Sequence, residues 1–148
     1  MTDHHATTAR IGGHPIHPML VPFPIVCFVG ALCTDIAYAR SENLQWANFS
    51  AWLLAAGMVM GVLAAIAGLI DFLTHRGIRD QRPAWPHAIG NAIVLLLALF
   101  NNFIHSRDGW TSVVPAGLIL SAATVAVMLV TGWLGWSLVY RHGVGVRS

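Results

Sequence analysis

Histidine is the residue of this chain whose spacing most directly suggests chemistry. Residues 12–26 read GGHPIHPMLVPFPIV, with two His-Pro pairs three residues apart. Neutral imidazole binds transition-metal ions and haem iron, and it also transfers protons near neutral pH. A residue before proline favours extended or polyproline II geometry, in which residues three apart are separated by about 9 Å along the axis. We therefore expect His14 and His17 to make two separate contacts rather than to chelate one ion.

Four long apolar runs must position these histidines. They cover residues 22–39, 47–74, 86–105 and 113–140 of a chain that is 56% hydrophobic and 9% charged. Each run can cross a hydrocarbon core of about 30 Å at about 1.5 Å per residue. The connections are short, so consecutive helices should be antiparallel neighbours. The sequence therefore predicts an all-α integral membrane protein, a single up-and-down four-helix bundle over residues 1–148, and excludes a typical water-soluble domain.

The arginines predict how the bundle is oriented, because the chain contains no lysine. Arg40 and Arg107 fall on one side of the membrane, and the others fall on the side of the termini and the middle loop: Arg10, Arg76, Arg79, Arg82, Arg141 and Arg147. The positive-inside tendency then places both termini in the cytoplasm. Six tryptophans near the span ends are typical of an aromatic belt. No basic stripe favours a nucleic-acid partner.

Five of the eight histidines fall at the predicted cytoplasmic face, contributed by all four helices: His14, His17, His75, His87 and His142. Asn91 lies one turn from His87 on the same helix face and adds a polar group at that level. An interfacial histidine can equally be an amphipathic residue at a wet boundary or a partner for helix-end carbonyls. His105, alone at the other face, is interpreted as structural, and His4 and His5 belong to an N-terminal tail.

Two helices carry small residues along one face. In the second run the face consists of Gly57, Gly61, Ala64, Gly68, Asp71 and His75. The fourth run repeats the design with Gly117, Ser121, Thr124, Met128, Thr131, Gly135, Leu138 and His142. Such faces let another backbone or a flat cofactor approach closely, and they are equally typical of ordinary helix packing.

Two acids lie inside the predicted spans, where a charge costs roughly 2.5–3.5 kcal/mol near the bilayer centre and less towards the ends. Asp71 and His75 are four residues apart, so we expect the carboxylate to accept a ring N–H and to fix the histidine tautomer. Asp35 lies near the far end of the first helix. We interpret it as a hydrogen-bond partner, with a proton or ligand path as the alternative.

Prolines interrupt the start of the first span. Pro22 and Pro24 lack an N–H, so a regular helix would leave the carbonyls of Pro18 and Leu20 unpaired. Non-helical backbone at membrane depth is tolerated only where it is buried in protein or lines a polar cavity. We therefore expect this segment to form a non-helical lid over the cytoplasmic mouth of the bundle; a rigid segment without any ligand is the alternative.

The strings HPIHPMLVPFPI, GLIDF, HAIGN and TGWLGWSLVYRHGVGV together resemble the bacterial membrane protein family called domain of unknown function 2231. The resemblance covers nearly the whole chain. It implies a location in the bacterial inner membrane. Some relatives resemble fusions to Rieske iron–sulfur or c-type cytochrome modules, which implies redox partners. His75 lies outside the family motifs, whose residues here are His14, His17, Gly68, Asp71, His87, Gly132, Gly135, Tyr140 and His142.

The leading hypothesis is a membrane electron-transfer protein that binds haem b at the cytoplasmic end of the bundle. Haem iron in such bundles takes two imidazoles from facing helices, and we expect His87 with either His142 or His17. His14 and an arginine, Arg82 or Arg141, would hold the propionates. Residues and resemblance together suggest a cofactor-binding set of His14, His17, Asp71, His87, Asn91, Tyr140 and His142, with His17, His87 and His142 as metal ligands.

A second hypothesis uses the same residues without haem: His14, His17, His87, His142 and Asp71 could bind a divalent transition metal, or they could relay protons with Asp35. A third hypothesis is a cofactor-free scaffold for redox proteins, which could also form homo-oligomers. An interfacial histidine could hold a quinone. The sequence contains no nucleophile elbow, phosphate loop or HExxH motif, so little favours an enzyme.

Overall fold

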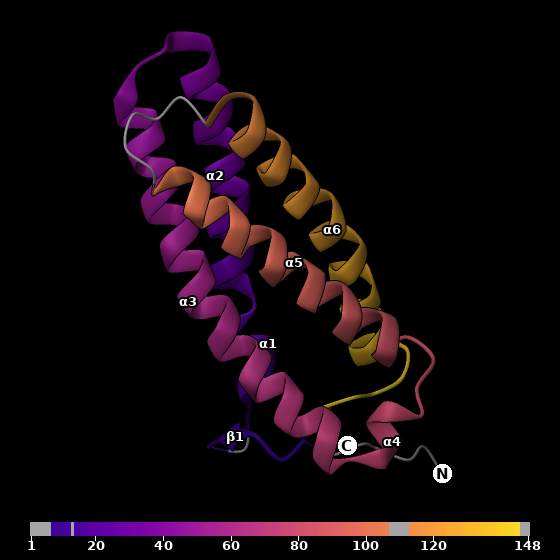
Figure 1. Cartoon of the computed structure of the whole chain (residues 1–148). Helices are drawn as coiled ribbons and strands as arrows, with labels where there is room; N and C mark the ends of the chain where they lie inside the picture. Colours follow the sequence, from indigo (N-terminus) through magenta and orange to yellow (C-terminus); the bar gives the residue numbers. More distant parts are fainter. Residues whose placement is uncertain (1–6, 13, 107–112, 146–148) are drawn as a thin grey trace.

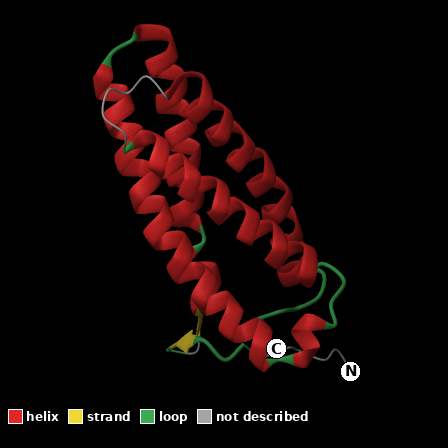
Figure 2. Cartoon of the chain, in the orientation of Figure 1, coloured by secondary structure: helices red, strands yellow, loops and turns green. Residues whose placement is uncertain are grey.

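Four long helices make up most of the computed structural model, which describes residues 7–12, 14–106 and 113–145 (Figures 1 and 2). Each of the four spans is long and apolar enough to cross a membrane. They consist of α1 (Ile16–Leu20) with α2 (Pro22–Ser41), α3 (Leu44–Thr74), α5 (Ala84–His105), and η1 (Val113–Gly117) with α6 (Leu118–Tyr140). The short elements are β1 (Arg10–Ile11), its antiparallel partner β2 (His14–Pro15), and α4 (Arg76–Arg79). The predicted all-α bundle is confirmed.

Short connections set the order of the helices. Glu42 ends α2 in a left-handed conformation (φ 54°), and the side chain of Asn43 caps α3 by accepting the N–H of Gln45 at 3.0 Å. With so short a link, α3 must return alongside α2. Each of α2 and α5 packs against both α3 and α6, so helices that follow one another lie side by side.

Both described ends of the chain meet at one end of the bundle, where Gly145 lies against Thr7 and Pro15. We call this the terminal end. Its location in the cytoplasm remains a prediction. Several residues used in the sequence predictions lie outside the described part of the chain: His4, His5, Arg107, Trp110 and Arg147.

The start of the first span differs from its prediction. Val21, between α1 and α2, has helical angles (φ −54°, ψ −38°), so the chain is close to helical from Ile16 onwards. Pro22 and Pro24 lie in the first turn of α2, where a missing N–H is tolerated. The predicted non-helical lid over these prolines is therefore wrong. The extended geometry predicted for both histidines is found at His14 in β2, whereas His17 lies within α1.

The two helical hairpins, α2 with α3 and α5 with α6, repeat one pattern of burial. Asp35 and His105 are 70 positions apart, and the same shift relates all the buried residues of α2 (Pro24, Phe28, Ala31 and Asp35) to buried residues of α5 (Val94, Ala98, Asn101 and His105). A second constant difference in residue number relates most buried residues of α3 to buried residues of α6, for example Gly57 to Thr124 and Ala64 to Thr131. Equivalent helices lie diagonally across the bundle, because the direct neighbours of α2 are α3 and α6. The bundle therefore has a pseudo-twofold axis along its length.

Small residues on α3 and α6 face inwards, as predicted. At Gly57 an added Cβ would lie 2.6 Å from Cε1 of Phe28 and 2.9 Å from Cβ of Cys27. Phe28 is 2% exposed and belongs to the central cluster with Ala31, Leu54, Val94, Ala98 and Met128. Close approach of α2 to α3 thus depends on the absence of a side chain at Gly57.

Substitution of Gly57 by alanine is expected to destabilise the bundle by about 1–3 kcal/mol, because the new methyl group overlaps the Phe28 ring. Unfolding of the detergent-solubilised protein in increasing SDS measures this loss. Gly132→Ala is the matched control, since an added Cβ there meets nothing within 4 Å. Equal loss of stability in both variants would contradict the packing argument.

Candidate functional site

Two histidine rings meet on the pseudo-twofold axis near the terminal end. His17 comes from α1 and His87 from the first turns of α5. Their ring centroids are 6.1 Å apart and the ring planes are almost perpendicular, at 89°. Both residues occupy equivalent positions in the repeat, with the same shift that relates Asp35 to His105. The structure thus brings together two of the predicted site histidines.

The two rings are held in the same way. Nδ1 of His17 lies 2.7 Å from the backbone oxygen of Ala64, and Nδ1 of His87 lies 2.9 Å from that of Thr131. A carbonyl oxygen can only accept, so each Nδ1 must carry a proton and donate it. In a neutral ring the lone pair then remains on Nε2. Metal-binding histidines are commonly fixed in this manner, because the second nitrogen donates to a carbonyl or carboxylate.

Glycine makes room for both rings. Gly68 and Gly135 lie one helical turn after the two accepting carbonyls. An added Cβ would lie 2.8 Å from Nδ1 of His17 at Gly68, and 2.9 Å from Cε1 of His87 at Gly135. The sequence predicted that these faces admit another backbone or a flat cofactor, and the flat groups found against them are the imidazole rings.

Asn91 covers the ring of His87, in agreement with its predicted place on the same face. Its Nδ2 donates to the backbone oxygen of His87 at 2.8 Å. The same nitrogen is nearly equidistant from the two ring nitrogens, at 3.4 Å from Nδ1 and 3.2 Å from Nε2. It is therefore not aligned with the in-plane lone pair of either nitrogen. The Nε2 lone pair of His87 remains available to a ligand.

A cavity of about 80 Å³ adjoins the two rings. Its polar lining residues are both histidines, Asn91 and Thr131, and its other walls include Gly61, Ala64, Val94 and Met128. One water takes about 30 Å³ of liquid, whereas pockets for organic ligands usually measure about 300–1,000 Å³. The cavity thus suits a few waters, or an ion with its waters.

Four of the predicted site residues do not line this cavity: His14, Asp71, Tyr140 and His142. His14 is exposed in β2. His142 follows the end of α6, where its backbone N–H donates to the backbone oxygen of Ser137 at 3.2 Å. Tyr140 is 72% exposed and packs against Trp136. Within the described residues, no three histidine, cysteine or acidic side chains are grouped closely enough to hold a metal ion. Of the expected metal ligands, the structure pairs His17 and His87.

Asp71 has a different partner from the one predicted. Its Oδ1 accepts the backbone N–H groups of Thr8, at 2.7 Å, and Ala9, at 2.9 Å. His75 has left the helix (φ −116°, ψ 106°), so the spacing of four residues no longer aligns it with Asp71. Its Nδ1 lies instead near the hydroxyl oxygens of Thr74 and Thr8. Asp71 therefore anchors the N-terminal strap, residues 7–12 and 14–15, to α3.

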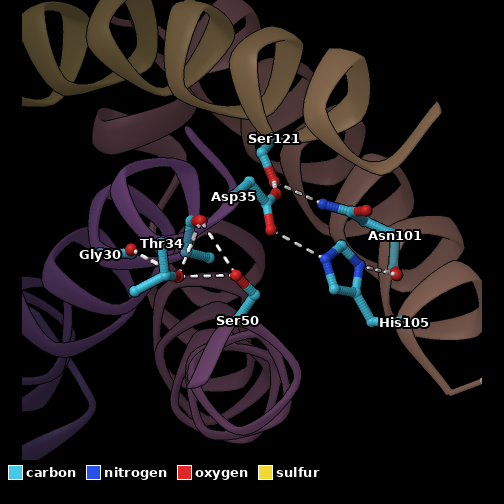
Figure 3. A network of polar contacts seen from close by, with 8 residues as sticks. Gly30, Thr34, Asp35, Ser50, Asn101, His105 and Ser121 are labelled. Atoms are coloured by element: carbon cyan, nitrogen blue, oxygen red, sulfur yellow. Dashed lines mark hydrogen bonds and ion pairs between the residues drawn. The ribbon is translucent and has the colours of Figure 1, made fainter. Parts of the chain in front are cut away.

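A second polar cluster lies at the opposite end of the bundle (Figure 3). Nε2 of His105 and Oδ1 of Asp35 are 2.9 Å apart, and both side chains are buried. The predicted hydrogen-bond role of Asp35 is confirmed, but its pairing with His105 was missed. The signal that could have found it is the shared shift, since His17 with His87 and Asp35 with His105 are equivalent pairs in the repeat.

Comparison with known proteins identifies the family of the chain. The family described as "Predicted membrane protein (DUF2231)" matches residues 13–148. The chain belongs to this family. No curated protein and no solved structure matches it. In this DUF2231 protein the GLIDF, HAIGN and TGWLG strings all serve the paired histidines, because they contain Gly68, His87 with Asn91, and Thr131 with Gly135.

Replacement of Asp71 by alanine is expected to release the N-terminal strap, since two backbone N–H groups lose their charged acceptor. Hydrogen exchange at the amides of Thr8 and Ala9 should become at least about tenfold faster, which corresponds to about 1.4 kcal/mol. Asp80→Ala, at an exposed site in the loop after α4, is the control. Unchanged exchange at these two amides would show that Asp71 does not hold the strap.

Proposed function

We propose that this protein is a membrane-embedded metal-binding protein whose ion is bound between His17 and His87. One observation carries the proposal: both rings donate Nδ1–H to a helix carbonyl, so both Nε2 lone pairs are available beside one cavity. Two ligands with the same fixed tautomer favour coordination, because the tautomer that binds metal through Nε2 is already selected.

The chemistry of the site favours a first-row transition metal. Imidazole suits zinc, copper, iron and nickel. A metal–imidazole bond measures about 2.0–2.1 Å, so two nitrogens on opposite sides of one ion lie about 4 Å apart. Ring centroids 6.1 Å apart are compatible with this separation. Water in the cavity would complete the coordination. With copper or iron, such a site would also carry an electron.

Haem b fits the described geometry less well than a single ion. His17 and His87 are the residues that would hold its iron, from the two halves of the bundle. However, a cavity of about 80 Å³ is far below the volume that organic cofactors need. The groups expected at the propionates are also elsewhere: His14 and Arg82 are exposed, and Arg141 lies 5.8 Å above the ring of Trp136. The ion therefore ranks above haem as the proposed ligand.

The metal site is tested with the purified full-length protein in mild detergent. Titration with Cu⁺, Zn²⁺ or Co²⁺ should give one strongly bound ion per chain. Truncation of either ligand, in His17→Ala or His87→Ala, should weaken binding of that ion by more than about 100-fold, since one of the two protein bonds is lost. His14→Ala is the matched control because this exposed histidine is close in sequence and does not line the cavity.

The same samples decide between the ion and haem. A visible spectrum with and without dithionite, after expression with a haem precursor, should show no Soret band. A Soret band that disappears in the His17 and His87 variants would replace the ion by haem at the same pair. Metal binding that is equal in all four proteins, without haem, would refute the site at His17 and His87.

A further inference from the structure

The cluster at the opposite end joins the two halves of the bundle through buried polar groups (Figure 3). Asp35 of α2 is 0% exposed and His105 of α5 is 1% exposed. Asn101 of α5 and Ser121 of α6 complete the cluster, and both are also buried. These groups lie within membrane-spanning helices, where no bulk water can hydrate a charge.

Hydrogen-bond directions in this cluster follow from the chemistry of its members. Nδ2 of Asn101 can only donate, and it lies 2.7 Å from Oγ of Ser121. The hydroxyl of Ser121 can therefore direct its own proton to Oδ2 of Asp35, at 2.6 Å. This orientation leaves Oδ1 of Asn101 without a partner among the described residues. The two donors in sequence, Asn101 and Ser121, thus end on Asp35.

The ring of His105 requires a further proton. Its Nδ1 is 3.0 Å from the backbone oxygen of Asn101, which can only accept, so Nδ1 carries a hydrogen. Its Nε2 is 2.9 Å from Oδ1 of Asp35, and that contact needs a hydrogen as well. The hydrogen belongs either to an imidazolium or to a protonated carboxyl. Both descriptions contain the same number of protons.

We infer that Asp35 and His105 form a proton-binding site, in which the pair holds one proton more than a carboxylate and a neutral imidazole. With this proton the pair is neutral overall and every contact has a donor and an acceptor. Without it, a bare nitrogen would face an oxygen at Nε2 or at Nδ1, and a negative charge would lie uncompensated inside the membrane.

The surroundings of the pair contain neutral groups in the described part of the chain. Asn101 and Ser121 contact the pair or each other, and the hydroxyls of Thr34 and Ser50, 2.6 Å apart, form a neighbouring polar pair between α2 and α3. No other titratable side chain among the described residues makes a hydrogen bond or ion pair with Asp35 or His105. The bound proton thus links the α2–α3 hairpin to the α5–α6 hairpin. A movement that separates Asp35 from His105 would leave this proton on only one of the two groups.

The proton is detected by ¹⁵N NMR of the full-length protein, labelled at histidine and placed in lipid nanodiscs near neutral pH. Signals of His105 are assigned by their loss in His105→Gln. We expect its Nδ1 signal in the protonated range. The additional proton should then appear either as a protonated Nε2 or, in the infrared spectrum, as a carboxylic acid band of Asp35.

Asp35→Asn is the matched variant, because its amide can donate to Nε2 and accept from Ser121 without a titratable proton. Its His105 should keep a protonated Nδ1 with a bare Nε2, and any Asp35 acid band should be lost. A wild-type ring with one bare nitrogen, either Nδ1 or Nε2, and no acid band would overturn the proposal. The wild-type spectra decide the question even if the variant fails to fold, and they do not depend on metal at His17 and His87.

Discussion

Close approach of side chains to helix backbones, at positions that bear glycine, is the constraint on which this structure depends. Lipid provides no hydrophobic force between helices, so contact must come from packing and from internal hydrogen bonds. Gly57 admits the ring of Phe28, and Gly68 and Gly135 admit the two imidazoles. In each hairpin the ring then reaches a carbonyl one turn before the glycine. The absence of a side chain at these glycines thereby permits both the close packing of the rings and their hydrogen bonds to the helix carbonyls.

The internal repeat explains why the polar groups occur in pairs. A twofold relation brings equivalent positions together at the axis, so one histidine in each half produces a pair without any further design. At the terminal end both positions are histidine, whereas at the opposite end one is Asp35 and the other His105. Two like rings offer lone pairs to a ligand. An acid and a base satisfy each other and hold a proton, so the two ends of one axis have different chemistry.

Hydropathy was sufficient to predict the four spans, because only helices satisfy their own backbone in lipid, and the inward faces of α3 and α6 followed from the spacing of small residues. The wrong predictions came from applying rules for local sequence at positions where the surrounding structure decides the outcome. Pro22 and Pro24 were read as breaking the helix, yet they occupy a first turn that needs no N–H. Asp71 was assigned to His75 by spacing, whereas two strap amides, far away in sequence, are its partners.

The sequence by itself determined the membrane-spanning class, the number of spans and the residue types available for chemistry, because these depend on composition and short periodicity. Its motifs also indicated the family. The tertiary structure decided which histidines meet. Five were expected at one face, but the distance between side chains from different helices depends on rotation and diagonal packing, which no local pattern contains. The bundle brings His17 to His87 and His105 to Asp35, and it leaves His14 exposed and His142 beyond the end of α6.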